Sequence, residues 1–133
     1  MESTHSFPKI MELNVGGVHY SVSLSTLTKL ENTTLAMMFS GKWAAPCDRD
    51  GRYFIDRSFY DPFTFRDGKM FRYVLNYLRC PDRVGLPQSP GDLQQLKVEA
   101  DYYQLKELSF HIEKLIQREH KVQYCKVSLF FFL

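Results

Sequence analysis

A pair of glycines between two alternating runs constrains this chain more than any other feature of its sequence. In the stretch MELNVGGVHYSVSL (11–24), apolar side chains occupy every second position on both sides of Gly16 and Gly17. A two-residue loop between paired strands needs positive φ angles, which glycine adopts without steric cost. The pattern therefore predicts a β-hairpin, whose alternating residues are Met11, Leu13 and Val15, then Val18, Tyr20 and Val22.

A phosphate-binding loop is the competing interpretation of the two glycines. Such loops follow the patterns GxxxxGK[ST] or GxGxxG and open onto a helix, whose N-terminal amides bind the phosphate. Here no Lys-Ser or Lys-Thr pair follows the glycines, and VHYSVSL continues as a strand. We therefore expect a turn, and no stabilisation of the native state by ATP, GTP or NAD.

Two short helices are expected after the hairpin, because hydroxyl residues that can cap helices alternate there with apolar ones. The first helix carries Leu27 and Leu30, and Gly41 ends the second. The inner side of the second helix is formed by Leu35, Met38 and Phe39. The candidate N-caps are Ser25 or Thr26 for the first helix and Thr33 or Thr34 for the second.

One further strand and three longer helices complete the expected elements. The segment DRDGRYFID predicts a turn and then a strand over 53–55. A helical period of apolar residues predicts helices over 69–79, 89–105 and 106–122, and Pro81 ends the first of them. Their inward residues are Phe71, Val74, Leu75 and Leu78, then Leu93, Leu96 and Ala100, then Leu108, Ile112, Leu115 and Ile116.

Composition and motifs exclude several classes of function. The 133 residues are enough for one domain, and 17 basic against 15 acidic residues give no electrostatic argument for binding nucleic acid or anionic membranes. No HExxH or GxSxG motif is present, and no Cys/His spacing for zinc involves Cys47, Cys80 or Cys125. There is no signal peptide and no apolar run near the about 20 residues of a membrane span. We expect a cytoplasmic protein without enzymatic activity, cofactor, metal or membrane insertion.

The helix expected over 69–79 carries a face of aromatic and polar residues beside its apolar stripe. Tyr73 and Tyr77 fall off the stripe, and the face is completed by Arg72, Asn76 and Arg79. Tyrosine and arginine are enriched in interface hot spots, so this face is a candidate subunit contact. A plain solvated face is the alternative interpretation.

Five segments occur in the order found in one known domain family: ELNVGGVHYSVSLSTLTKL, LAMMFSGK, GRYFIDR, DGKMFRYVLNYLR and EADYYQLKEL. Together they resemble the BTB/POZ domain of the potassium-channel tetramerisation-domain (KCTD) family, a close relative of the cytoplasmic T1 domain of voltage-gated potassium channels. The resemblance covers residues 7–118. Within the family, SFPKIMELNVGG looks most like the subgroup of GABA-B receptor auxiliary subunits.

The resemblance implies an α+β fold of the BTB/POZ (T1-like) type, in which a small mixed sheet packs with a cluster of helices. It implies self-assembly into a ring, typically a pentamer in this family and a tetramer in channel T1 domains. It implies a non-enzymatic role as a homo-oligomeric scaffold or a receptor or channel auxiliary subunit, or alternatively as a Cullin-3 ubiquitin-ligase adaptor. The residues that it implies for the oligomer interface are Asp56, Arg57, Asp67, Gly68, Arg72, Tyr73 and Asn76.

The chain departs from the family in three places. The segment SFYDPFTFR (58–66) is inserted between FIDR and DG, where neighbouring subunits are expected to touch. Loops accept insertions at about 0.6 kcal/mol per doubling of length, so we expect the fold to survive but ring closure to be impaired. The alternative is that the aromatic residues of the insert extend the contact. The Cys/His set of zinc-bridged T1 domains is missing, and the chain ends soon after the last BTB helix, so we expect client-binding functions to be absent from this polypeptide.

These considerations give an expected domain organisation. Residues 1–9 form a flexible lead-in, residues 10–120 a BTB/POZ domain with the insert 58–66, and residues 121–133 an apolar tail. A channel T1 domain is disfavoured because the chain has no transmembrane segment. The expected partners are further copies of the chain, with Cullin-3 or the cytoplasmic tail of a membrane receptor as a second partner.

Overall fold

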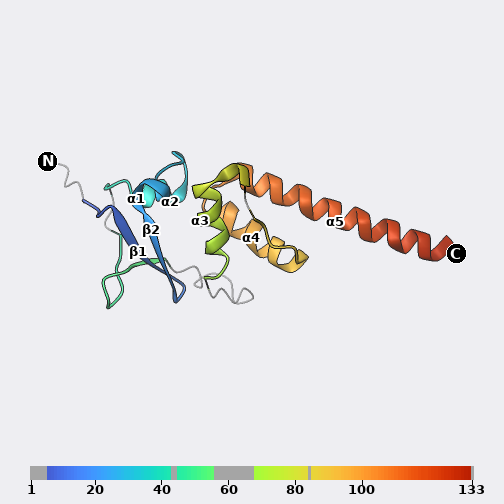
Figure 1. Ribbon diagram of the computed structural model, residues 1–133, viewed down its shortest axis with the longest axis horizontal. Coiled ribbons are helices and arrows are strands. Elements are labelled where there is room, and N and C mark those ends of the chain that lie inside the picture. Colours follow the sequence, from blue (N-terminus) through green and yellow to red (C-terminus); the bar gives the residue numbers. More distant parts are fainter. Residues whose placement is uncertain (1–5, 43–44, 56–67, 84, 133) are drawn as a thin grey trace.

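Three strands and five α-helices are present in the computed structural model, which describes residues 6–42, 45–55, 68–83 and 85–132 and the side chains as far as residue 125. Figure 1 shows the strands and the two short helices at one end of the molecule, α4 and α5 at the other, and α3 between them. The elements are β1 (Ile10–Val15), β2 (Val18–Ser23), α1 (Leu24–Leu27), α2 (Thr34–Met38), β3 (Tyr53–Ile55), α3 (Phe71–Arg79), the 3-10 helix η1 (Pro81–Arg83), α4 (Pro90–Tyr102) and α5 (Lys106–Phe132).

The predicted hairpin is formed by β1 and β2. The strands pair antiparallel, with Val15 opposite Val18, so the loop contains only the two glycines. Gly16 has a φ of 56° and Gly17 a φ of 97°, which matches the mirror-image turns that suit the twist of paired strands. The side-chain oxygen of Asn14 accepts a hydrogen bond from the Gly17 amide at 2.8 Å and so stabilises the turn.

The third strand makes the sheet mixed. β3 covers the three residues that the sequence predicts and pairs parallel to β1, which gives the order β2-β1-β3. The Gly16 amide donates a 2.9 Å hydrogen bond to the Ile55 carbonyl and extends this pairing into the turn. A small mixed sheet with helices confirms the predicted α+β class.

The short helices differ from expectation at one of their two N-caps and in the length of the first helix, which ends at Leu27 and so does not include Leu30. The hydroxyl of Ser23 accepts the Thr26 amide at 3.2 Å, so α1 begins earlier than a cap at Ser25 or Thr26 would allow. That expectation was wrong because the strand passes directly into the helix, and the hydroxyl nearest the strand end is the one in place to cap. Thr33 caps α2 through a 3.2 Å bond from the Ala36 amide, as one of the two predicted candidates.

The helix α3 buries the stripe that its sequence predicts. Phe71, Val74, Leu75 and Leu78 are all buried in the core. Tyr77 is only 7% exposed and also belongs to the core, so its assignment to the polar-aromatic surface was wrong. Tyr77 lies beside Glu107 and Leu108 at the start of α5, and this neighbour from a distant part of the sequence widens the buried stripe beyond the four residues.

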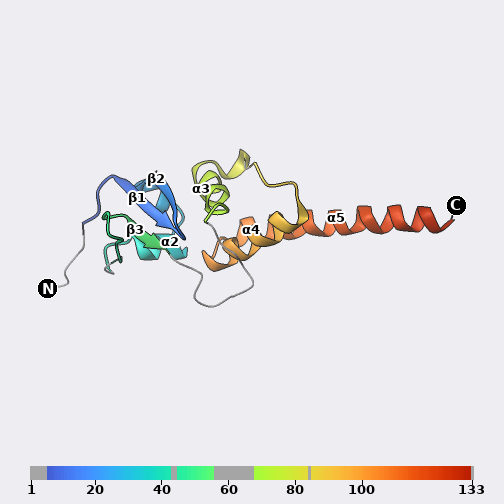
Figure 2. The same ribbon diagram turned by 90° about the horizontal axis from the view of Figure 1, so that it is seen from below.

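The helices α4 and α5 pack side by side, and α5 then extends alone beyond the rest of the molecule in both ribbon views (Figures 1 and 2). Ser89 caps α4 by accepting the Asp92 amide at 3.3 Å. The last helix continues to Phe132 instead of ending at Val122. Over the described residues, no helix is long and apolar enough to span a bilayer.

Candidate subunit interface

The predicted interface residues that the structure describes lie at the start of α3, beside β2. Gly68 has a φ of 73°, and a Cβ atom placed there would lie 1.9 Å from the carbonyl oxygen of Val15. Only glycine fits so close to the β1 backbone with this dihedral angle. The Tyr20 hydroxyl donates a 2.7 Å hydrogen bond to the Gly68 carbonyl and so ties β2 to the chain entering α3.

Arg72 and Tyr73 form the surface next to this junction. The Arg72 guanidinium is exposed and lies 5.3 Å from the centre of the half-buried Tyr73 ring, a cation–π arrangement. Asn76 lies one turn further along α3 and is partly exposed. The surface therefore presents a cation held against an aromatic ring, followed by a carboxamide.

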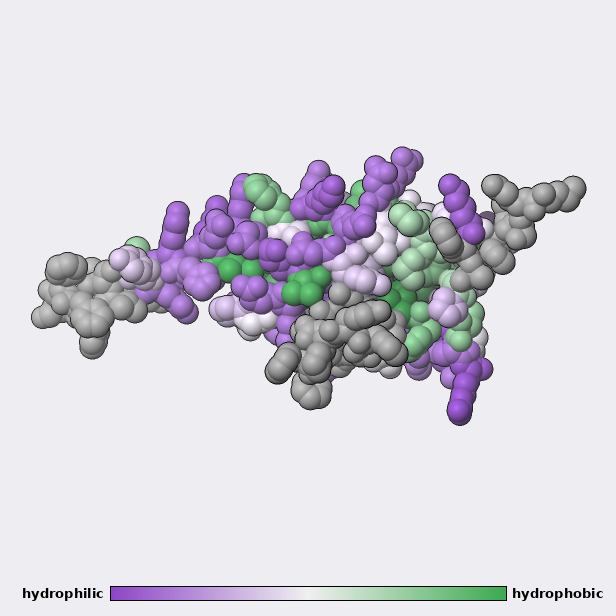
Figure 3. All heavy atoms as spheres, turned by 180° about the vertical axis from the view of Figure 1, so that it is seen from behind, coloured by the Kyte–Doolittle hydropathy of each residue, from purple (hydrophilic) through white to green (hydrophobic). Residues whose placement is uncertain are grey.

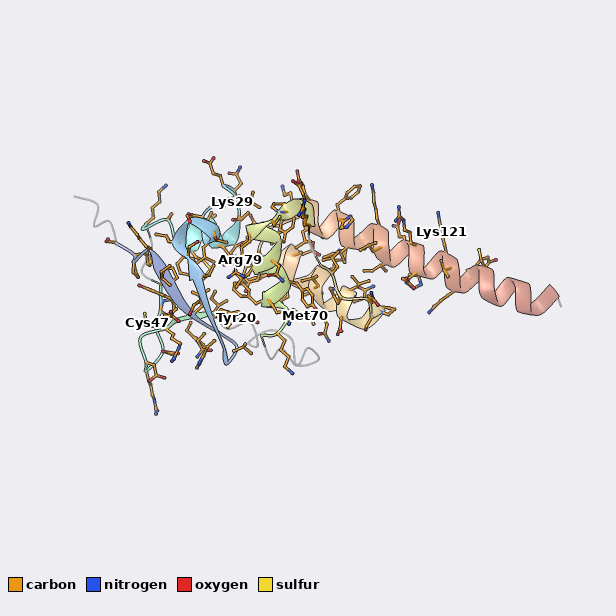
Figure 4. The ribbon with its side chains drawn as sticks, in the orientation of Figure 1. Tyr20, Lys29, Cys47, Met70, Arg79 and Lys121 are labelled. Atoms are coloured by element: carbon orange, nitrogen blue, oxygen red, sulfur yellow. The ribbon has the colours of Figure 1, made fainter. Side chains whose placement is uncertain are left out.

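A hollow of about 280 Å³ lies at the same place and is lined by Tyr20, Lys69, Met70, Arg72 and Tyr73. Figure 4 shows Tyr20 on β2 and Met70 at the beginning of α3, on the same side of the molecule. The Tyr20 ring packs edge-on against Phe71, with 5.4 Å between ring centres, so the floor of the hollow is fixed by the core. We call the hollow and its lining residues the α3 entry surface.

The structure brings together Gly68, Arg72, Tyr73 and Asn76, whereas Asp56, Arg57 and Asp67 lie outside the described residues, as does the insert 58–66. Tyr20 was not predicted as an interface residue, because its place in the alternating strand marked it only as a sheet residue. Its hydroxyl is the signal that was available, since a tyrosine at the edge of a sheet tends to bond a polar partner.

The arrangement offers groups that are suited to recognising another protein. Within the described ranges, no three His, Cys, Asp or Glu side chains are placed to hold a metal ion. The three cysteines are free and exposed. A rigid junction, an exposed guanidinium and an aromatic floor are instead features typical of a protein-binding surface.

Residues 11–114 match the BTB/POZ domain family. The match covers most of the chain, so the chain belongs to that family, in its potassium-channel tetramerisation type, and the predicted family is confirmed. BTB/POZ domains of this kind are modules for protein–protein interaction.

Among curated proteins, the mouse (Mus musculus) and human (Homo sapiens) proteins named BTB/POZ domain-containing protein KCTD21 are 43% identical to this chain over 107 residues. The aligned region covers 80% of this chain but 36% of each relative. The chain thus spans about a third of the length of the curated relatives that it matches.

Proposed function

We propose that this chain is a homo-oligomerising BTB/POZ scaffold of the KCTD type, which uses the α3 entry surface as one side of its subunit contact. The observation that carries the proposal is the exposed Arg72 guanidinium held against the half-buried Tyr73 ring, on a junction that the Gly68–Tyr20 hydrogen bond makes rigid. A rigid site loses little conformational entropy on binding, which favours association. We place the protein in the cytoplasm, as a scaffold or as an auxiliary subunit of a receptor or channel.

A ring is the assembly that we propose, with five subunits first and four as the alternative. A ring contact is head-to-tail, so the α3 entry surface meets a different surface of the neighbouring subunit. Charged and hydrogen-bonding groups such as Arg72 and Asn76 then set orientation and register more than total affinity.

Light scattering over a concentration series tests the proposal. We expect a mass above that of one chain, and a contact about tenfold weaker for Arg72→Glu, because the pair at the centre of the surface is lost. Arg118→Glu is the matched control, since it makes the same charge change at an exposed position on α5. A single-chain mass at every concentration, with and without residues 58–66, would contradict the proposal.

A Cullin-3 adaptor is the second candidate, and one feature favours it. A hollow of about 620 Å³ lies along α1 and α2, and Met37 on its rim is 54% exposed. Exposed methionine is suited to binding another protein. None of the residues that line this hollow belongs to the α3 entry surface, so we propose that a bound Cullin-3 molecule leaves the α3 entry surface accessible.

Titration of the chain with the purified N-terminal region of Cullin-3 tests this candidate. Binding that Met37→Glu abolishes and that Val98→Glu leaves intact would support it, because Val98 is a similarly exposed apolar residue on α4. Absence of binding, or equal effects of the two substitutions, would contradict the Cullin-3 candidate and leave the scaffold role as the single proposed function.

A further inference from the structure

A short segment before β1, residues 6–9, inserts one aromatic side chain into the domain, and we call this segment the strap. The Phe7 ring packs edge-on against Phe39 at the C-cap of α2 and against Tyr53 at the start of β3, with 5.6 and 5.4 Å between ring centres. Phe39 and Tyr53 also meet edge-on, at 5.9 Å. Figure 2 shows α2 beside β3, near the end of the molecule where the chain begins. We call the site formed by these two rings the aromatic seat, and it holds a phenylalanine in a geometry that aromatic pairs prefer.

The strap is held weakly for a segment that touches the core. The carbonyl of Lys9 accepts a 2.8 Å hydrogen bond from the Leu24 amide, and this is the one backbone hydrogen bond of the strap within the described part of the chain. Pro8 has no amide hydrogen to donate. Phe7 is half-buried, whereas Pro8 and Lys9 are exposed. Segments with few buried contacts open locally at a lower free energy than the core, so we expect the strap to open while the domain stays folded.

Both attachment points of the strap adjoin the hollow of about 620 Å³ along α1 and α2. Leu24, which bonds the strap, and Phe39, which contacts the Phe7 ring, are among the residues that line this hollow. Phe39 is only 2% exposed while the strap is in place. Opening of the strap would therefore uncover aromatic surface at the edge of the hollow, beside a rim on which Met37 is already 54% exposed.

We propose that the aromatic seat is a binding site for a phenylalanine in an extended segment of another protein, and that the strap fills this site in the unbound chain. The strap itself shows the chemistry that fits, which is an aromatic ring followed by a proline that disfavours helix at the preceding residue. Pockets that take single side chains of an extended segment are a common means of recognising peptides. The inference depends neither on the subunit contact at α3 nor on binding of Cullin-3.

A peptide of residues 3–10 (STHSFPKI) is the probe, added to the full chain and followed by NMR chemical shifts of the Phe39 and Tyr53 amides. The Phe7→Ala variant of the chain leaves the seat without its own ring. We expect this variant to bind the peptide and the unmodified chain to bind it at least about tenfold more weakly, because a seat that is filled for about nine-tenths of the time is open for about one-tenth.

Two matched controls accompany this titration. The same peptide with Phe7→Ala should not bind, because it lacks the ring that the seat takes. A chain with Ile10→Ala should behave like the unmodified chain, since Ile10 is 59% exposed and takes no part in the seat. No binding of the peptide to folded Phe7→Ala chain up to about 1 mM, or equal binding to this variant and to the unmodified chain, would overturn the inference.

Hydrogen exchange of the unmodified chain tests opening of the strap without any substitution, and it decides the matter if Phe7→Ala fails to fold. The Leu24 amide is bonded to the strap, so its exchange reports when the strap opens. We expect it to exchange at least about tenfold faster than the amides that pair β1 with β2, and to respond little to low urea, as local opening does. Exchange of Leu24 as slow as that of β1, with the same urea dependence, would show that the strap opens only when the domain unfolds and would refute the proposed site.

Discussion

At the scale of single residues, Gly68 is the position with the least freedom to change. Its φ of 73° disfavours side chains, and the Val15 carbonyl occupies the space of a Cβ. In the sequence, Gly68 was marked only through the family resemblance, because its close approach to β1 is a long-range contact that no local pattern reveals. The hairpin glycines could be assigned from the sequence, since two alternating runs on either side define their turn.

We expect Gly68→Ala to destabilise the fold by about 3 kcal/mol, because the strained dihedral angle and the clash with Val15 add up. Gly51→Ala is the matched control: Gly51 has a similar φ of 80°, but nothing lies within 4 Å of the position that a Cβ would take there. That variant should cost only about 1 kcal/mol. Urea denaturation at one fixed protein concentration measures both, and equal losses would show that the close approach is unimportant.

At the scale of elements, α5 has two parts with different support. Leu108, Ile112 and Ile116 are buried against the core, whereas residues 117–125 are all exposed. Figure 3 shows mainly hydrophilic residues along α5 on the face behind that of Figure 1. The apolar period predicted the first part correctly. The predicted end at Val122 was wrong because no glycine or proline follows this residue, so nothing in the local sequence stops the helix there.

Hydrogen exchange measured by mass spectrometry should separate these two parts of α5. A helix without tertiary contacts is marginal in water, so amides over 121–125 should exchange with little protection. Amides over 108–116 should approach the protection of global unfolding. Uniform protection along the helix would show that a further surface covers the exposed part.

The extent of the buried face of α3 is another property that belongs to this scale. Periodicity identified Phe71, Val74, Leu75 and Leu78, all of which are buried, but it left Tyr77 on the surface. The width of a buried stripe depends on which element packs against it, and the contact with α5 is distant in sequence.

At the scale of the whole molecule, the order of the sequence motifs was enough to predict the fold class and the family. Self-association depends instead on which residues the fold brings to the surface. The order of motifs from the hairpin to α5 identified a BTB/POZ domain, and the match over 11–114 confirms it. We assign the α3 entry surface, which includes Arg72, to one side of the proposed subunit contact. The insert 58–66 lies in sequence just before this surface, so we propose that it weakens the ring.

The most direct test is light scattering coupled to size exclusion, on the full chain beside a version without residues 58–66. We predict a closed ring for the shortened chain and a smaller mass for the full chain at equal concentration. Equal ring masses would contradict the proposed effect of the insert. A shortened chain that remains single at high concentration would contradict the central claim that this protein acts by binding copies of itself.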